Sequence, residues 1–224
     1  MSVTQPRVRS DSGPFERHLR EAIALNRERA PRYAQLSRGT SQRISTALIG
    51  AELALLPVAR WFDAAARPYH AAGIPLLEDL FVPMSNAPAF EESRLMSAAA
   101  QVVSFRRPRA IRLRVRRAYR EGSFTAAAEV LEDELALLAV EAETNCLLRH
   151  VLESAYRLAL LAPTHVTQAQ ASGLRSPAPL LGRLLALHLW GLRAANALDR
   201  RALPLQRRGI AILAQDLPRI PPSS

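Results

Sequence analysis

The chain has 224 residues, of which 49% are apolar, so it can bury a substantial core and is unlike a disordered protein in composition. Its single cysteine excludes an intramolecular disulfide and favours a reducing compartment. The formal net charge is +10, and every basic residue other than histidine is an arginine, because the sequence contains no lysine.

The N-terminal part of the chain predicts a polar tail followed by two helices. Residues 1–12 lack the apolar stretch of a secretory signal and are expected to be disordered. Pro14 opens a first helix that is expected to stop before Pro31, because proline disfavours helical geometry in the residue that precedes it. A second, apolar helix is predicted over residues 41–72, and Gly73 is expected to end it in a left-handed conformation.

The middle of the chain predicts a helix over residues 86–105 and a very basic segment at residues 106–120. Apolar and basic residues alternate between Ala110 and Arg116, which is a strand signature. A helix is nevertheless the preferred interpretation, because only residues 101–105 offer a second strand for pairing.

Two further long helices follow the basic segment. Ser123 is expected to cap the first, whose apolar residues recur at spacings of four and three and which should continue to Leu161, before Pro163. The second is expected to begin at Ser176 and to continue to Arg208.

These elements predict an all-α fold, because amphipathic helices joined by short connections bury their apolar stripes against one another in a bundle. The helical domain is expected to cover residues 13–217, and residues 218–224 are expected to form a C-terminal coil. The longest apolar runs, near residues 47–59 and 184–192, are too short for a bilayer, so no membrane span is predicted.

Residues 17–80 can be aligned with residues 149–216, which suggests two copies of one helical unit packed about a pseudo-twofold axis. The matched pairs are Arg17/Arg149, His18/His150, Glu21/Glu153, Ala30/Ala162, Pro31/Pro163, Ala34/Ala169, Gln35/Gln170, Ser37/Ser172, Asp63/Asp199, Pro68/Pro204, Gly73/Gly209, Ile74/Ile210 and Leu77/Leu213. The alternative is that a sequence rich in Ala, Leu and Arg aligns with itself by composition. The matched prolines and glycines argue for a true repeat, because these residues have specific backbone roles.

Charge is distributed unevenly along the chain. Residues 1–43 sum to +5, residues 44–105 to −3, residues 106–148 to +1 and residues 149–224 to +7. The absence of lysine fits a GC-rich genome, in which arginine codons replace lysine codons. The alternative is selection against lysine modification in a protein that is delivered into a host cell.

Six residues form a candidate metal site. Two His-x-x-Glu pairs, at His18 and at His150, each place a histidine and a glutamate one helical turn apart, and the repeat adds Glu52 and His188 at equivalent positions. Carboxylate-bridged metal pairs in helical bundles use similar ligand pairs, although in the reverse order. The candidate ligands are His18, Glu21, Glu52, His150, Glu153 and His188. The alternative is that these are surface histidines beside solvated glutamates.

Arginine clusters supply two candidate binding surfaces. The first could grip nucleic-acid phosphates and consists of Arg106, Arg107, Arg109, Arg112, Arg114, Arg116, Arg117 and Arg120. Its alternative role is to lie against the acidic helix that follows and to be neutralised by it. The second has only Asp199 as a neighbouring acid and could bind an acidic protein partner through Arg200, Arg201, Arg207 and Arg208.

The favoured function is a non-enzymatic helical adaptor, chaperone or assembly factor that binds an acidic protein partner through basic surfaces. The sequence contains no Ser/His/Asp arrangement, phosphate-binding glycine loop or zinc-type cysteine spacing, so neither a catalytic residue nor a cofactor is predicted. The alternatives are an arginine-rich nucleic-acid-binding protein and a metal-dependent oxidoreductase with its site in the bundle core. A cytoplasmic, reducing location is expected, and the sequence does not specify the oligomeric state.

Overall fold

The computed structural model describes residues 12–37, 39–80, 108–139, 146–206, 208, 210 and 212–213. These residues form α1 (Pro14–Leu36), α2 (Thr40–Ala71), the 3-10 helix η1 (Glu78–Leu80), α4 (Pro108–Ala139), α5 (Cys146–Ala171) and α6 (Ala178–Gln206). No strand occurs in this part of the chain, so the predicted all-α fold is confirmed, and the basic segment from residue 108 is helical. The helix predicted over 86–105 and the coil predicted at 218–224 lie outside the described residues, as does nearly all of the predicted tail.

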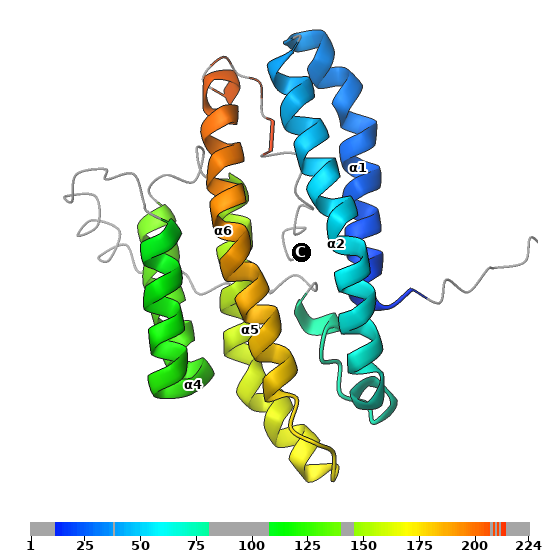
Figure 1. Cartoon of the computed structure of the whole chain (residues 1–224), viewed down its shortest axis with the longest axis vertical. Coiled ribbons are helices and arrows are strands. Elements are labelled where there is room, and N and C mark those ends of the chain that lie inside the picture. Colours follow the sequence, from blue (N-terminus) through cyan, green and yellow to red (C-terminus); the bar gives the residue numbers. More distant parts are fainter. Residues whose placement is uncertain are drawn as a thin grey trace, which may run out of the picture.

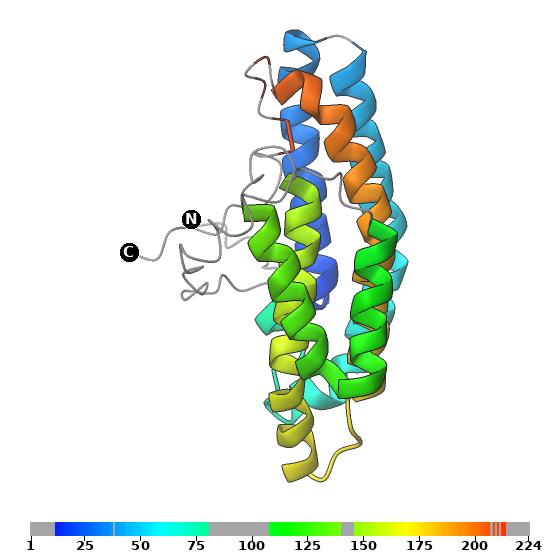
Figure 2. The same cartoon turned by 90° about the vertical axis from the view of Figure 1, so that its left-hand side faces the viewer.

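The helices form two antiparallel hairpins, α1 with α2 and α5 with α6, and the hairpins meet where α2 packs on α6 (Figure 1). The remaining helix, α4, packs against α5 and α6 on the side away from the first hairpin. Non-helical backbone at Gly122 and Ser123 divides α4 into two segments, which lie side by side in Figure 2. Buried side chains from all five helices and from η1 join one core cluster.

Each hairpin is locked by an aspartate of its second helix that caps the first. The Asp63 carboxylate accepts backbone N–H bonds from Phe15 at 3.0 Å and from Glu16 at 2.9 Å, at the start of α1. The helix needs this acceptor from outside because its N-cap residue, Gly13, supplies no side-chain hydrogen bond. A Cβ atom on Gly13 would lie 2.3 Å from the Asp63 Cγ atom, so only glycine leaves room for the carboxylate.

The second hairpin repeats this cap. Asp199 accepts from the backbone N–H groups of Leu147 at 3.0 Å and Leu148 at 2.8 Å. Burial raises the pKa of Asp199 to about 6, because desolvation of the carboxylate outweighs the two backbone hydrogen bonds that favour its charged form. Asp63 and Asp199 are a matched pair of the predicted repeat, so equivalent positions of the two hairpins make the same contact.

The ends of α2 and α6 are also built alike. The N–H of Ile74 bonds the carbonyl oxygen of Tyr69 at 2.9 Å, and the N–H of Ile210 bonds that of Leu205 at 3.0 Å, which is the same five-residue step at matched positions. Gly73 has a φ of 77°, as predicted for the residue that ends α2. A common origin of the hairpins stays a prediction, and these contacts are consistent with it.

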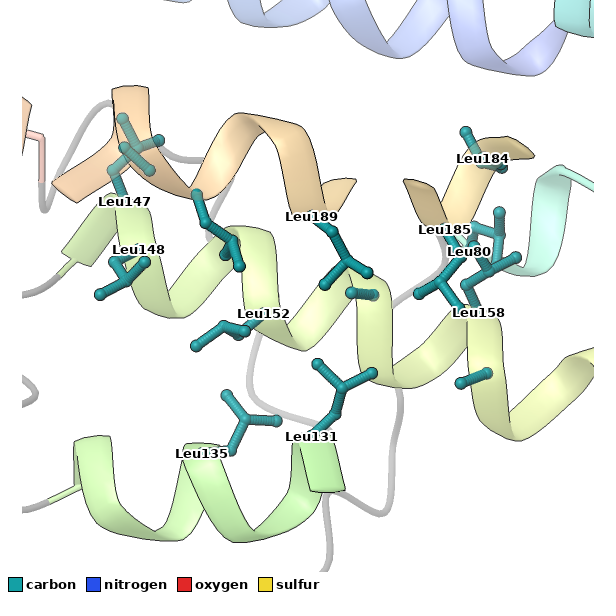
Figure 3. Close-up of a cluster of buried hydrophobic side chains, with 14 of the residues drawn as sticks. Leu80, Leu131, Leu135, Leu147, Leu148, Leu152, Leu158, Leu184, Leu185 and Leu189 are labelled. Carbon is teal, nitrogen blue, oxygen red and sulfur yellow. The ribbon is translucent and has the colours of Figure 1, made fainter. Parts of the chain in front are cut away.

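The two hairpins differ where α4 covers one and not the other. Leu148 and Leu152 of α5 are fully buried, and Figure 3 shows Leu152 pointing from α5 toward Leu131 and Leu135 of α4.

At the matched positions, α1 carries Glu16 and Arg20 instead of these leucines, and the carboxylate of Glu16 accepts from Arg20 at 2.6 Å and from Arg60 at 3.0 Å. Although burial of Glu16 acts in the opposite direction, these two guanidinium groups lower its pKa. Both matched positions are therefore leucine on α5, where α4 covers them. On α1, where α4 does not cover them, both hold charged residues that form ion pairs.

Two predicted helix ends and the predicted continuity of one helix are wrong. Both α1 and α5 continue through Pro31 and Pro163, because each ring lies on the exposed side of its helix, where water can reach the carbonyl that loses its donor. The single helix predicted from residue 123 to residue 161 is two helices, since α4 ends at Ala139 and α5 begins at Cys146. The Asp199 cap stabilises this new helix start, and the cap comes from a residue far away in sequence.

Replacing Asp63 with asparagine should lower the free energy of unfolding by about 1–2 kcal/mol, because the amide retains only one oxygen for two backbone donors. Urea denaturation followed by circular dichroism measures this change. Asp133→Asn is the matched control, since Asp133 is exposed on α4. Equal losses of unfolding free energy in Asp63→Asn and Asp133→Asn would show that the cap does not stabilise the fold.

Replacing Gly182 with alanine should destabilise the contact between α6 and α4. The new Cβ would lie 2.6 Å from the hydroxyl oxygen of Tyr119, an overlap that should cost about 1–3 kcal/mol. Tyr119→Phe removes that oxygen and should recover part of the loss in a double-mutant cycle of unfolding free energies. Gly50→Ala is the control: no atom lies within 4 Å of its Cβ position, so it should stabilise by about 0.5–1 kcal/mol. Strictly additive effects at Gly182 and Tyr119 would contradict the predicted clash.

Candidate functional site

Three histidines from three helices come close together inside the bundle. His18 of α1, His150 of α5 and His188 of α6 are each half-buried. Burial, and then positive charge on His18, His188 and Arg157, lowers the pKa of His150 to about 4. Burial also lowers the pKa of His18 and that of His188. The His150 ring is therefore neutral at pH 7.

Two of the other predicted metal ligands, Glu52 and Glu153, are engaged by neighbouring side chains, and the third, Glu21, is exposed on α1. Glu52 accepts a hydrogen bond of 2.7 Å from the side-chain amide of Asn26, which is buried. Glu153 pairs with Arg149 of the preceding turn at 2.7 Å. The Nδ1 atom of His188 donates to the Leu184 carbonyl oxygen at 2.8 Å, which leaves Nε2 as the acceptor nitrogen of the neutral ring.

The described residues include no group of three or more His, Cys, Asp or Glu side chains that could hold a metal ion. The six predicted ligands, His18, Glu21, Glu52, His150, Glu153 and His188, therefore do not form a ligand set. The physical reason includes the competing contacts of two glutamates, since Glu52 bonds Asn26 and Glu153 pairs with Arg149.

The basic segment of α4 is partly neutralised by acids of the same helix. Arg114 pairs with Glu134 of the second α4 segment at 2.5 Å, and Arg117 pairs with Glu121 at 2.9 Å. Glu134 is buried, so this pair also ties the two segments together. The exposed arginines outside these pairs are Arg109, Arg116 and Arg120, Arg112 is half-buried, and Arg106 and Arg107 lie outside the described residues.

The C-terminal arginine cluster is only partly described. Arg200 and Arg201 are exposed near the end of α6, and Arg208 is exposed in the turn that follows. Arg207 lies outside the described residues. The acid expected to offset these charges, Asp199, is 1% exposed and points to the start of α5, so it does not shield them at the surface.

The outer side of α2 is a surface that sequence analysis did not predict. Among the residues described, α2 is the one helix long and apolar enough to cross a membrane. Only 22% of its most apolar 18-residue stretch is nevertheless buried. Its inner stripe joins the core through Ile44, Leu48, Ala59, Phe62 and Ala66. On the opposite side, exposed residues recur at alternating spacings of three and four. We call this row the outer seam of α2, and it consists of Ala47, Gly50, Ala54, Pro57, Trp61 and Ala64.

A second row on α6 adjoins the outer seam of α2. The outer seam of α6 has the same spacing and consists of the partly buried Leu187 and the exposed Trp190, Ala194 and Ala197. Trp190 is 66% exposed, more than any other large apolar side chain in the described ranges. The guanidinium carbon of Arg183, one turn before Leu187 on α6, lies 5.5 Å from the ring centroid of Trp61 and so links α6 to the outer seam of α2. Together with Arg183, the two seams form what we call the α2–α6 face.

No acidic side chain of α2 or α6 is exposed. The acids of α2 are Glu52, which bonds Asn26, and the buried cap Asp63, and the acid of α6 is the buried cap Asp199. The exposed basic residues of these helices are Arg43, Arg60, Arg67, Arg183, Arg193, Arg200 and Arg201. The α2–α6 face is thus apolar along its seams and positively charged around them.

Comparison with known proteins identifies no relative: no family model, curated protein or solved structure matches this chain.

Acid should destabilise the fold through His150. Because its folded pKa of about 4 lies below the ordinary value of 6.5, the unfolded chain binds more protons between these values, and stability is lost as the pH falls through this window. The expected loss from His150 alone is about 2–3 kcal/mol between pH 7 and pH 4.5.

Urea titrations of the wild type and of His150→Gln at both pH values measure this effect. Asp199 has the opposite dependence in an overlapping window, because its pKa is raised, so the difference between the two proteins is the informative quantity. A difference that does not change between pH 7 and pH 4.5 would contradict the predicted role of His150.

Proposed function

We propose that this chain is a non-enzymatic helical adaptor or assembly factor that binds a protein partner on the α2–α6 face. The observation that carries the proposal is that the outer seam of α2 consists of apolar residues, like its inner stripe, although only the inner stripe lies in the core. A helix with apolar residues on two opposite sides is ordinarily covered on both. The outer seam of α2 therefore has the composition of a surface that is covered in the working state.

The residues on this face are those that dominate protein–protein interfaces. Tryptophan and arginine are the side chains most enriched among interface residues that contribute strongly to affinity. Trp61 is 47% exposed, Trp190 is 66% exposed, and Arg183 stacks on the first of these rings. An apolar centre with a charged edge is the usual arrangement of such an interface.

Small residues on the outer seam of α2 favour a protein over a lipid surface. Ala47, Gly50 and Ala54 leave the helix backbone open to close approach by another helix. A helix that lies in the membrane interface instead presents large apolar side chains to the acyl chains. The exposed side of α2 has two large apolar side chains, Leu53 and Trp61, beside a majority of small ones.

The C-terminal arginines extend this face. Arg201 follows Ala197 by four residues on the exposed side of α6 and so continues the outer seam of α6. The partner-binding role expected for Arg200, Arg201, Arg207 and Arg208 therefore becomes a proposal about one end of the α2–α6 face. Positive charge there would speed association with an acidic partner.

Nucleic-acid binding through α4 is the second candidate. Its supporting observation is the exposure of Arg109, Arg116 and Arg120 on one helix. The ion pairs of Arg114 and Arg117 reduce the charge that this surface offers to phosphates. We therefore favour the protein partner.

Site-specific photo-crosslinking in the native cell tests the proposal. A photoreactive phenylalanine analogue at position 190 should form adducts with a protein, whereas the same analogue in place of Thr125, which is exposed on α4, should not. Arg201→Glu should reduce the adduct yield at position 190, because it removes attraction for the partner. Equal yields at both positions, or adducts with nucleic acid, would refute the assignment of this face to a protein.

A further inference from the structure

We infer that the partner presents one amphipathic α-helix, with large aliphatic residues along its apolar stripe and acidic residues on both edges. This inference rests on the proposed function and adds the chemistry of the partner to it. Spacing, side-chain size and charge on the α2–α6 face each contribute one part of that description.

The spacing of the outer seam of α2 calls for a helix. Its residues alternate at steps of four and three, which is the repeat by which two helices pack along each other at about 20°. From Ala47 to Ala64 the outer seam spans about 25 Å at 1.5 Å per residue, so it can seat between four and five turns of a partner. The exposed side of α6 adds a second wall where Arg183 meets Trp61.

The small side chains of the outer seam of α2 indicate that the partner presents large residues to it. Ala47, Gly50 and Ala54 are small, and a Cβ atom on Gly50 would meet nothing within 4 Å. Closely packed helices match small residues on one side with large residues on the other. Leucine or isoleucine side chains of a partner would fill this part of the outer seam, and Trp61 and Trp190 would pack beyond it.

The charges call for acidic edges on that helix. Arg43 and Arg67 stand at the two ends of the outer seam of α2, and Arg183 and Arg201 flank that of α6. The same charges disfavour a second copy of this chain as the occupant, because two copies of the face would bring arginine against arginine. A partner helix with glutamates or aspartates beside its apolar stripe would pair with these arginines.

Two labelled synthetic peptides test this chemistry on the full chain by fluorescence anisotropy. Both have leucines at alternating spacings of three and four, and they differ only in carrying glutamate or lysine on both edges of that stripe. The glutamate peptide should bind, and the lysine peptide should not. The double variant Arg43→Glu, Arg67→Glu should reverse this preference, because the edge charges have changed sign.

Matched variants show where the peptide binds. Gly50→Leu and Ala54→Arg fill the outer seam of α2 and should each weaken binding of the glutamate peptide by at least about tenfold. Ala24→Arg, on the exposed side of α1, should have no effect. Thermal unfolding of Gly50→Leu at or above the wild-type temperature establishes that the fold is intact, since the Cβ position of Gly50 is open.

Several results would overturn the inference. Equal binding of the two peptides, binding of neither, or equal weakening by Ala24→Arg would show that the face does not select an acidic helix. Binding to phosphatidylserine vesicles that Ala54→Arg abolishes would assign the face to lipid. A dimer in light scattering that Ala54→Arg dissociates would assign it to a second copy. Protein adducts at position 190 without peptide binding would leave the proposed function standing and refute only the acidic helix.

Discussion

The hydrogen bonds from one aspartate carboxylate to the start of the neighbouring helix are the contacts on which the rest of this structure depends. Asp63 and Asp199 each tie the middle or end of a second helix to the first turn of a first helix, and so set the register of each hairpin. The matched residues His18 and His150 are near enough for charge on His18 to lower the pKa of His150. Because Asp63 of α2 and Asp199 of α6 are buried as caps, they place no negative charge on the outer surface of these helices.

Helix α4 makes the two hairpins unequal. Its leucines cover Leu148 and Leu152 on α5, whereas the matched positions of α1 hold Glu16 and Arg20 in an ionic cluster with Arg60. In the first hairpin, charged side chains therefore occupy the positions of α1 that α4 does not cover. The exposed apolar residues of this hairpin lie on α2 instead. An apolar surface without its own cover, next to an exposed tryptophan of α6, is the feature from which the proposed function follows.

Most helices of this chain could be predicted from local signals, and the errors have one cause. Pro31 and Pro163 were expected to end helices, because a sequence does not show that their rings lie on the solvent side. The sequence does not show that α4 and α5 are separate helices, because the residue that stabilises the start of α5, Asp199, is remote in sequence. The spacing of the predicted metal ligands is also a local signal. It does not reveal that the Glu52 carboxylate accepts a hydrogen bond from Asn26 of another helix. The spacing of small residues along the second helix was visible in the sequence, but its exposure was not.

The sequence by itself determined the all-α class, the extents of α2 and α6, the left-handed Gly73 and the excess of positive charge, because each depends on periodicity or on the conformational limits of single residues. Only the tertiary structure decided which side of α2 enters the core, which acids cap the neighbouring helices and which histidines are buried enough for their pKa to be lowered. These outcomes depend on contacts between residues about fifty or more positions apart, and the free energy of such contacts is set by burial and geometry that exist only after the hairpins have packed.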